Sequence, residues 1–493
     1  MKGLIPTFFQ RLANPANSGA VILLILGLAV APPRVRGSAF AIGEQGTRAA
    51  GMGTAFTSIA DDGSAIYYNS AGIAFQPGFH MEMDGLVVVG LFRFFPSAPP
   101  PGQVIPEKGF SGAIKPHFIP VASLYLSKQI RPNWTFGFGV FAPFGLSANF
   151  TNFNDGDPAL TKFPGRWAGT RASLECFWFQ PTIAHKFNES HAIGLGVALV
   201  YTHLFLEQSF LNPLDDGLDF GREAANTVFP GVDKEQAARA IARLLPEGRS
   251  RVAGQAFSPG FNASYLYRNA KHKMNFGLSW RSAVVNHLSG EASFAFGNDY
   301  TLKQFVGSDL LFKAFPNQPV HGLFTTPAMY AAGVSKAAMG MTLSLDFHLQ
   351  DFYRFSDLPL NFTQTKQTNP DVRTPAEKRL VFDFRNSWQI AFGVEKPLSR
   401  RNLTLRAGYF FDYTPVVDKS VGPLFPDATR NSLTVGGSKR TKSAELSLFY
   451  EAMWYQNRTV NVSANAVKGT NGLYDNFTHL FGFAMHIGPS RTK

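Results

Sequence analysis

Two neighbouring segments near the C-terminus alternate apolar and polar side chains with a period of two. In residues 382–395, one set of alternate positions is mostly aromatic or aliphatic, and the other is polar, charged or small. Residues 403–411 repeat the pattern after a short basic turn. Because successive side chains of a β-strand point to opposite faces, each segment is predicted to be a strand with one apolar face. Strands of roughly ten residues with this pattern are typical of membrane-spanning β-barrels.

The composition fits a chain that folds as one membrane-spanning sheet. After the N-terminal region, the sequence has no run of the ~18 apolar residues that a transmembrane helix needs. Phenylalanine is abundant, with 48 residues, as expected of a lipid-facing surface. The single cysteine, Cys176, excludes an internal disulfide. The formal charge is +12, but the basic residues are dispersed, so we expect no nucleic-acid partner.

Residues 1–41 are predicted to be a signal peptide. A basic start precedes an apolar stretch at 20–31, and small residues follow it. We expect cleavage after Ala39 or Ala41. The apolar stretch is too short to remain as a spanning helix, so the segment indicates export from the cytoplasm.

The alternating pattern recurs along residues 79–493, which we expect to form the barrel. An even number of strands suits an antiparallel barrel. Short connections alternate with long ones, so we expect the long loops outside the cell and the short turns in the periplasm. The long loops include 296–325, 356–378 and the longest, 211–251. The fourteen predicted strands are 79–94, 117–128, 134–148, 169–186, 191–210, 252–268, 273–295, 326–336, 339–355, 379–396, 402–415, 430–438, 442–457 and 477–488.

Residues 42–78 do not have a strand pattern. The segment is rich in Gly, Ala, Asn and Asp, which favour tight turns and short helical pieces. Its small side chains would also allow close packing. Two interpretations remain open at this point: a periplasmic linker before the barrel, or a plug inside the lumen.

Several short motifs follow one another in order along the mature chain, at 44–46, 51–55, 68–72, 142–146, 165–167, 277–282, 405–409, 412–416 and 426–430. With these motifs the chain resembles the FadL/TodX family of outer-membrane transporters for long-chain fatty acids and other hydrophobic compounds. The resemblance implies an all-β barrel in the outer membrane of a Gram-negative bacterium, monomeric and without a cofactor. It also implies that residues 42–78 form a hatch that plugs the lumen. Such hatches usually contain Asn-Pro-Ala, whereas this chain has Asn69, Ser70 and Ala71.

The third predicted strand is interrupted by Pro143 and Gly145. Proline cannot donate a ladder hydrogen bond, and glycine permits bulges and bends. In the family, this strand bends inward and leaves a gap in the wall, so the resemblance implies lateral exit of the substrate into the bilayer. The alternative is that Pro143 simply lies at the strand end, above the membrane.

The longest loop, 211–251, is predicted to contain one short helix at 233–245. Asp233 is placed to cap it, and Ile241, Leu244 and Leu245 follow helical spacing. These three side chains are expected either to form an apolar groove that first captures the substrate, as in the family, or to pack on neighbouring loops.

Polar positions of the strands are expected to face the lumen, because an arginine facing lipid at mid-depth costs ~2–4 kcal/mol. Alternation then places Phe382, Phe384 and Trp388 on the lipid face. The residues assigned to the lumen are Asp383, Arg385, Gln389, Glu395, Arg406, Arg281, Asp346 and His348.

Arg385 and Arg406 are the first candidates for binding a carboxylate, and Arg281 is a third. The alternative is that they pair with nearby acids and hold the wall to the plug. The acids considered are Asp383, Glu395, Glu445 and Glu451.

Other chemistry is sparse. The histidines are scattered without metal-ligand spacing, and no phosphate-binding loop or nucleophile elbow is present. We therefore expect no metal site and no enzyme. The expected function is uptake of hydrophobic compounds, foremost long-chain fatty acids, with outer-membrane lipids as neighbours. A channel for aromatic or aliphatic hydrocarbons, a diffusive porin and a structural barrel are the alternatives.

Overall fold

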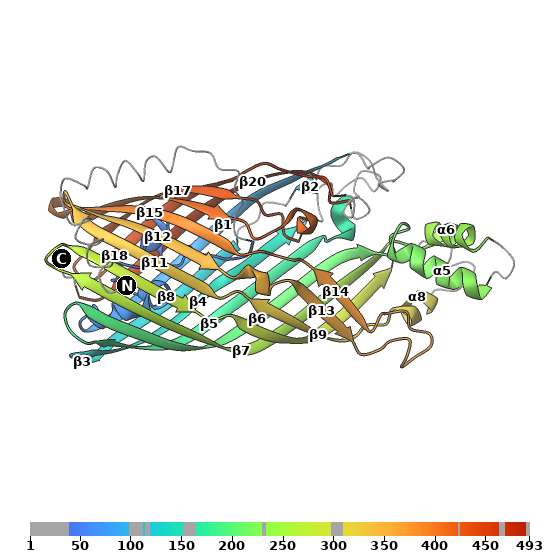
Figure 1. The fold of residues 1–493 in the computed structure, drawn as a ribbon, viewed down its shortest axis with the longest axis horizontal. Helices are drawn as coiled ribbons and strands as arrows, with labels where there is room; N and C mark the ends of the chain where they lie inside the picture. The colour runs from blue at the N-terminus through green and yellow to red at the C-terminus, as the bar shows by residue number, and fades with distance from the viewer. Residues whose placement is uncertain are drawn as a thin grey trace, which may run out of the picture.

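The computed structural model describes residues 39–97, 112–113, 119–150, 164–228, 233–296, 309–422, 424–462 and 469–489. Within these residues one antiparallel sheet closes on itself, because β20 pairs with β1 along most of its length (Figure 1). The closed ring contains fourteen strands, as predicted. They are β1 (Phe79–Pro96), β3 (Ile119–Arg131), β4 (Trp134–Asn149), β5 (Arg171–Lys186), β6 (His191–Phe210), β7 (Gly248–Asn269), β8 (Met274–Arg281), β11 (Met329–Ala338), β12 (Met341–Gln350), β15 (Ser387–Leu398), β16 (Leu403–Tyr413), β17 (Arg430–Arg440), β18 (Glu445–Tyr455) and β20 (Gly472–Ile487).

Additional strands extend the sheet beyond the ring. Four of them pair with one another in chain order, and the first pairs with residues 248–255 of β7. They are β9 (Val284–Phe296), β10 (Gln318–Thr326), β13 (Asp357–Phe362) and β14 (Glu377–Val381). Two short strands, β2 (Gly112–Ala113) and β19 (Arg458–Val460), pair with β1 and β20. The barrel wall is therefore much taller on one side than a ring of hairpins alone would be.

Two predicted strands and two predicted loops are wrong in detail. The segment 273–295 is split into β8 and β9, and 379–396 is split into β14 and β15. The predicted loops 296–325 and 356–378 contain β10 and β13. The pairing partner changes at each split, from β11 for β8 to β10 for β9. Alternation reports which face a residue occupies and carries no information about its partner strand, so the sequence pattern continues across the splits.

The outer face of the barrel is apolar. Leu195, Val197, Leu199 and Phe257 are between 52% and 65% exposed, and they alternate with buried residues on β6 and β7. This alternation is the pattern expected of strands that contact lipid on one side. Among the described helices, none is both long and apolar enough to cross a membrane.

The long connection between β6 and β7 contains two helices, α5 (Asp216–Val228) and α6 (Lys234–Leu244). They project from one end of the barrel, near α8 (Asp309–Ala314) (Figure 1). The Asp233 side chain accepts hydrogen bonds from the backbone at Glu235 and Gln236 and so caps α6. Helix α5 was not predicted, although Leu218 and Ala225 lie two helical turns apart on its buried face.

Residues 42–78 lie inside the ring of strands. They form the short helices α3 (Thr47–Ala50), α4 (Ala65–Tyr68) and η2 (Ser70–Phe75), and nearly all of their residues are buried. Glycines of the wall make room for them: a Cβ on Gly408 would lie 2.1 Å from the backbone nitrogen of Gly53. Gly393 and Gly277 have similarly close contacts with Met52 and Thr57. Close backbone approach of this kind requires glycine on the wall.

Candidate functional site: the lumen and its lateral edge

The segment 42–78 is hydrogen-bonded to the wall at widely separated points of the ring. Because β1, β7, β12 and β15 all contribute partners, the contacts hold the segment across the lumen. The bonds join Thr47 N to Asp84 Oδ1 (2.6 Å), Thr54 Oγ1 to Gln389 Oε1 (3.0 Å), Thr57 N to Asp346 Oδ2 (2.7 Å) and Asn69 Nδ2 to the carbonyl oxygen of Tyr265 (3.0 Å).

Ser70 provides a further attachment, at the position where a proline is usual in the hatches that this segment resembles. Its hydroxyl lies 2.7 Å from Asn262 Oδ1 and 2.7 Å from Ser264 Oγ, both on β7. The backbone N–H of Ala71 donates to the same Ser264 hydroxyl at 2.9 Å. A proline has no hydroxyl, so this chain replaces a rigid turn residue with a hydrogen-bonding one.

An ion-pair network also links the segment to the wall. Arg48 of α3 makes two hydrogen bonds of 2.7 Å to the carboxylate of Glu395 on β15 and contacts Asp61 and Asp62. Glu395 in turn accepts a 2.7 Å hydrogen bond from Arg406 on β16. Arg406, a predicted carboxylate ligand, thus faces the lumen but lies within the wall-to-plug network that was the alternative for it. Arg48 itself was not predicted, since charge within a Gly/Ala-rich segment has no periodic signature.

Strand β4 leaves part of its edge without a strand partner. Its pairing with β3 ends at Val140, which faces Leu124, and its register with β5 shifts between Phe141 and Phe144. Pro143 lies within this shift. In the described residues, 119–123 of β3 pair only with β1, and 141–149 of β4 pair only with β5. We call these two stretches the open β3–β4 edge.

The beginning of the described chain covers this edge. Ala41 forms a β-bridge with Phe144. Its neighbours add two backbone bonds: Ile42 N donates to Pro143 O at 2.8 Å, and Gly145 N donates to Phe40 O at 2.9 Å. Cleavage of the chain after Ala41 would remove part of this contact. Residues 1–38 of the predicted signal peptide lie outside the described residues.

Phenylalanine rings fill the lumen beside the open edge. Phe40 is at their centre, with five ring neighbours at centroid distances of 5.1–6.0 Å. All members are buried, and we call them the phenylalanine cluster: Phe40, Phe144, Phe324, Phe352, Phe355, Phe382, Phe384 and Phe425.

The positions of Phe382 and Phe384 correct the predicted lipid-facing assignment. The chain leaves the strand conformation between Val381 and Ser387, and Asp383 has a positive φ of 47°. Local alternation therefore fails here: both rings turn into the lumen, while Asp383 is exposed and pairs with Lys419. Once the strand is interrupted, parity counted along the sequence no longer identifies the face.

Arg385 follows directly after this interruption. Its guanidinium lies 4.8 Å from the ring centre of Tyr413, and its Nε donates to the carbonyl oxygen of Thr414 at 3.4 Å. The side chain is half-buried and next in sequence to Phe384 of the phenylalanine cluster.

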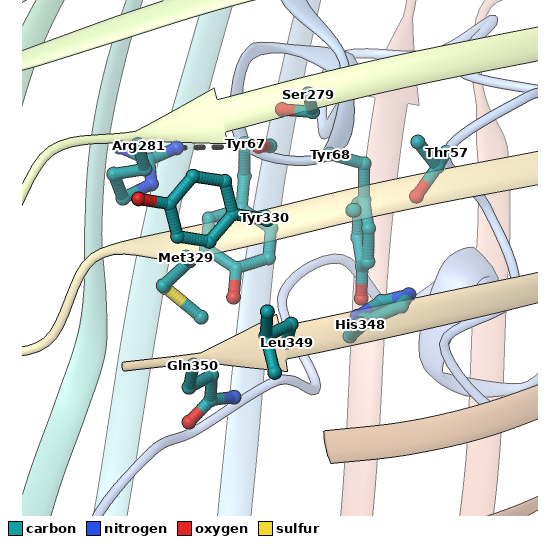
Figure 2. A pocket seen from close by; sticks show the side chains of 11 residues that line it. Thr57, Tyr67, Tyr68, Ser279, Arg281, Met329, Tyr330, His348, Leu349 and Gln350 are labelled. Carbon is teal, nitrogen blue, oxygen red and sulfur yellow. Dashed lines mark hydrogen bonds between the residues drawn. The ribbon is translucent and has the colours of Figure 1, made fainter. Parts of the chain in front are cut away.

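A small cavity of about 40 Å³ lies between the segment 42–78 and strands β8, β11 and β12 (Figure 2). Arg281, the third predicted arginine, lines it together with His348 and Gln350. Arg281 is only 3% exposed and donates to Gln180 Oε1 at 2.6 Å and to the carbonyl oxygen of Tyr67 at 3.2 Å. The other lining residues are Thr57, Tyr67, Tyr68, Ser279, Met329, Tyr330, Ala331 and Leu349.

The three predicted apolar residues of α6 do not act as one surface. Ile241 packs in the small core between α5 and α6, and Leu245 packs with Phe210 and Leu311. Leu244 is 40% exposed. Leu214, Leu310 and Phe312, from neighbouring parts of the same end of the barrel, are also exposed.

Among the described residues, no group of three or more His, Cys, Asp or Glu side chains is arranged to hold a metal ion. What the described lumen contains instead is the phenylalanine cluster, a small cavity beside Arg281 and the open β3–β4 edge.

Comparison with known proteins identifies the family of this chain. Residues 28–486 match the family described as outer membrane protein transport protein (OMPP1/FadL/TodX). A curated relative from Neisseria meningitidis serogroup B, described as an outer membrane protein, is 23% identical over 421 residues, covering 84% of this chain and 85% of the relative.

Solved structures share the fold. A Pseudomonas aeruginosa FadL homologue superposes with a TM-score of 0.72 at 17% identity, covering 92% of this chain and 100% of that one. The Pseudomonas putida toluene transporter TodX gives 0.62 at 15% identity, with coverages of 93% and 99%. The Ralstonia pickettii toluene transporter TbuX gives 0.57 at 16% identity, with coverages of 90% and 98%. This chain therefore belongs to the OMPP1/FadL/TodX family and is an outer membrane transporter of hydrophobic compounds, not an enzyme.

Proposed function

We propose that this transporter takes up long-chain fatty acids and releases them sideways into the outer membrane. With cleavage after Ala39, Phe40 is the first residue of the mature chain, and the observation that carries the proposal is that Phe40 belongs to two structures at once. Its ring is the centre of the phenylalanine cluster, and its carbonyl oxygen is bonded to Gly145 at the open β3–β4 edge. An acyl chain that takes the place of the Phe40 ring would therefore also loosen the cover of that edge.

Energetics favour lateral release for an apolar substrate. Burial of apolar surface is worth roughly 25 cal/mol per Å², and this stabilisation would be lost if the acyl chain passed into the aqueous periplasm. Passage from the phenylalanine cluster through the open edge keeps the chain in apolar surroundings. Pro143 and Gly145 serve this step by keeping β4 from pairing fully with its neighbours.

First capture takes place at the outer end. The exposed side chains there, Leu214, Leu244, Leu310 and Phe312, are each 40–49% exposed. Loop side chains of this size can hold an acyl chain weakly before it enters the lumen. Ile241 and Leu245 then contribute indirectly, because they fix the two helices and the core beneath them.

In this mechanism the hatch, residues 42–78, stays attached to the wall while residues 40–42 at its beginning move. The bonds of Asn69, Ser70 and Ala71 to β7 lie far along the chain from Phe40 and hold the rest of the segment. A shift confined to residues 40–42 then exposes the edge by breaking the Ala41–Phe144 bridge and its two flanking backbone hydrogen bonds, while the acyl chain replaces the ring contacts of Phe40.

A hydrocarbon is the second candidate substrate. The structurally similar proteins TodX and TbuX are toluene transporters. The phenylalanine cluster would accept an aromatic ring as well as an acyl chain, because edge-to-face ring contacts are favourable in either case.

The test measures uptake of palmitate, hexadecane and toluene into cells that carry the protein in place of their own hydrophobic transporters. We expect palmitate to be preferred and Phe40→Ala to reduce uptake of all hydrophobic compounds. Phe257→Ala, on the lipid face, is the matched control and should leave uptake unchanged. Arg385→Ala and Arg406→Ala test the two arginines: loss of palmitate preference in Arg385→Ala alone would place the carboxylate near the cluster. Equal uptake of toluene and palmitate by every variant would contradict the fatty-acid assignment.

A further inference from the structure

The short connections between the strands of the ring carry almost one sign of charge. With the strand residues that flank them, they span 128–133, 186–191, 268–273, 336–341, 396–401 and 439–444. These six turns contain thirteen lysines and arginines and one acid, Glu189. We call the thirteen the basic rim: Lys128, Arg131, Lys186, Arg268, Lys271, Lys273, Lys336, Lys396, Arg400, Arg401, Lys439, Arg440 and Lys442.

The fold gathers this charge at one end of the barrel. Because the strands of the ring are antiparallel, all six turns lie at the end opposite α5 and α6 (Figure 1). The formal charge of the six turns is +12, which equals that of the whole chain. The remaining residues therefore contain equal numbers of basic and acidic side chains. In the sequence the basic residues are dispersed, but in the barrel their whole excess faces the periplasm, since short turns lie on that side.

Little of this charge is neutralised by the protein. Within the described part of the chain, two members of the basic rim form ion pairs: Lys186 with Glu189 at 2.7 Å, and Arg440 with Glu445 at 3.5 Å. A third, Arg268, lies with its guanidinium 4.1 Å from the ring centre of Phe75. Of the other ten, nine are exposed. A dense set of exposed charges of one sign creates a field that attracts anions.

Large apolar side chains fix the depth of the basic rim relative to the bilayer. Ile130, Phe187 and Met339 lie within the turns and are 54%, 56% and 75% exposed, and Trp134 at the start of β4 is 37% exposed. Apolar and aromatic side chains that are exposed at the end of a membrane barrel lie at the membrane surface. The cations are only a few residues away from these anchors, so they lie at the level of the lipid headgroups.

The arrangement around the barrel favours a membrane over a soluble partner. The six turns belong to six different hairpins, so the cations are distributed around the perimeter of the barrel end. A folded acidic protein would contact one side of such a ring. Lipid headgroups surround a barrel completely, and negatively charged ones match a perimeter of cations.

We propose that the basic rim binds phospholipids with a net negative headgroup in the periplasmic leaflet, and so surrounds the transporter with anionic lipid on that side. The neighbouring apolar side chains contact the acyl chains of the same lipids. This binding is independent of the transported substrate and uses the outside of the barrel.

The test reconstitutes the purified full-length protein in phosphatidylcholine bilayers. Electron paramagnetic resonance of spin-labelled lipids then measures how strongly the protein-contacting lipids favour phosphatidylglycerol over phosphatidylcholine. We expect the intact protein to favour phosphatidylglycerol, by about fivefold for each lipid that contacts one cation. The preference should disappear in 1 M NaCl, where the Debye length is about 3 Å.

Two triple variants remove exposed charges from different parts of the basic rim. One combines Lys128→Gln, Lys271→Gln and Lys273→Gln, and the other combines Arg400→Gln, Arg401→Gln and Lys442→Gln. Both should reduce the preference about twofold or more, since each removes three of the thirteen cations. The matched control removes three charges from α6 at the outer end, as Lys234→Gln, Arg239→Gln and Arg243→Gln, and should retain the preference.

Three results would overturn the proposal. Equal association of both lipids with the intact protein shows that the basic rim does not select anionic headgroups. A reduced preference in only one of the two turn variants reduces the surface to a local patch. Binding of the protein to isolated peptidoglycan that falls in both turn variants, with an unchanged lipid preference, assigns the basic rim to an anionic polymer instead.

Discussion

Replacement of Ser70 by alanine should loosen the hatch from the wall. The Ser70 hydroxyl is fully buried and lies 2.7 Å from both Asn262 Oδ1 and Ser264 Oγ on β7. In Ser70→Ala the Asn262 oxygen loses its partner from the hatch. Ser264 keeps the hydrogen bond from Ala71 N at 2.9 Å, so part of the attachment survives.

The expected magnitude follows from these two bonds. A buried hydrogen bond contributes about 0.5–1.5 kcal/mol, so the loss of two destabilises the attached state by about 1–3 kcal/mol. If the detached state keeps its free energy, the equilibrium between the two shifts about 5- to 150-fold toward detachment. The barrel itself should remain folded, because its strand pairing is untouched.

The assay is single-channel recording in planar bilayers, together with amide hydrogen exchange of residues 69–75. We expect more frequent openings and faster exchange in Ser70→Ala. Ser432→Ala is the control, because Ser432 Oγ donates to Glu451 at 2.6 Å within the wall and does not bond to the hatch. Equal opening frequency and exchange in Ser70→Ala and the intact protein would refute the view that Ser70 attaches the hatch.

Three further changes test other parts of the structure. Arg48→Gln removes the cation that joins Glu395 of the wall to Asp62 of the hatch, while Glu395 keeps its ion pair with Arg406. The loss is at most about 3–5 kcal/mol, the cost of breaking a buried pair, and the variant should open the channel more often than Ser70→Ala in the same recordings. Gly408→Val places side-chain atoms where a Cβ alone would lie 2.1 Å from Gly53 N, so the hatch should be displaced and sensitivity to large antibiotics should rise. Burial raises the pKa of Asp427 from 3.8 to about 6, opposed by Arg430 and by a hydrogen bond from Thr414, so folding favours the protonated form. The loop 414–429 should therefore be most stable below the ordinary pKa and lose about 3 kcal/mol as the pH rises through 6, as measured by amide exchange, and Asp427→Asn should remove this dependence.

Much of the architecture could be read from alternation alone. A period of two in apolar side chains follows directly from strand geometry, and the lipid-facing rows on β6 and β7 have it without interruption. The number of strands in the ring followed for the same reason. The inward orientation of Arg281, Arg406 and Gln389 was also predictable, since a polar side chain facing lipid is costly and all three lie in strands, Arg281 as the last residue of β8.

Prediction from the sequence failed where the backbone leaves the strand conformation. Phe382 and Phe384 lie on the apolar parity of a strand that ends before them, and the positive φ of Asp383 turns both rings inward. The splits at β8–β9 and β14–β15 have the same origin, because a change of partner strand leaves no trace in alternation. The phenylalanine cluster, which draws its rings from six separate segments of the chain, could therefore not be predicted from the sequence.

The sequence by itself determined that the chain forms a closed membrane barrel, because the period of side-chain alternation depends only on the local backbone. Only the tertiary structure decided which polar side chains pair with one another. Arg406 and Arg281 are equivalent in the sequence pattern, yet Arg406 pairs with Glu395 on the neighbouring strand, which also binds Arg48 of the hatch, whereas Arg281 donates only to neutral groups. Such pairings depend on where residues 42–78 lie within the ring, and close packing between distant segments sets that position.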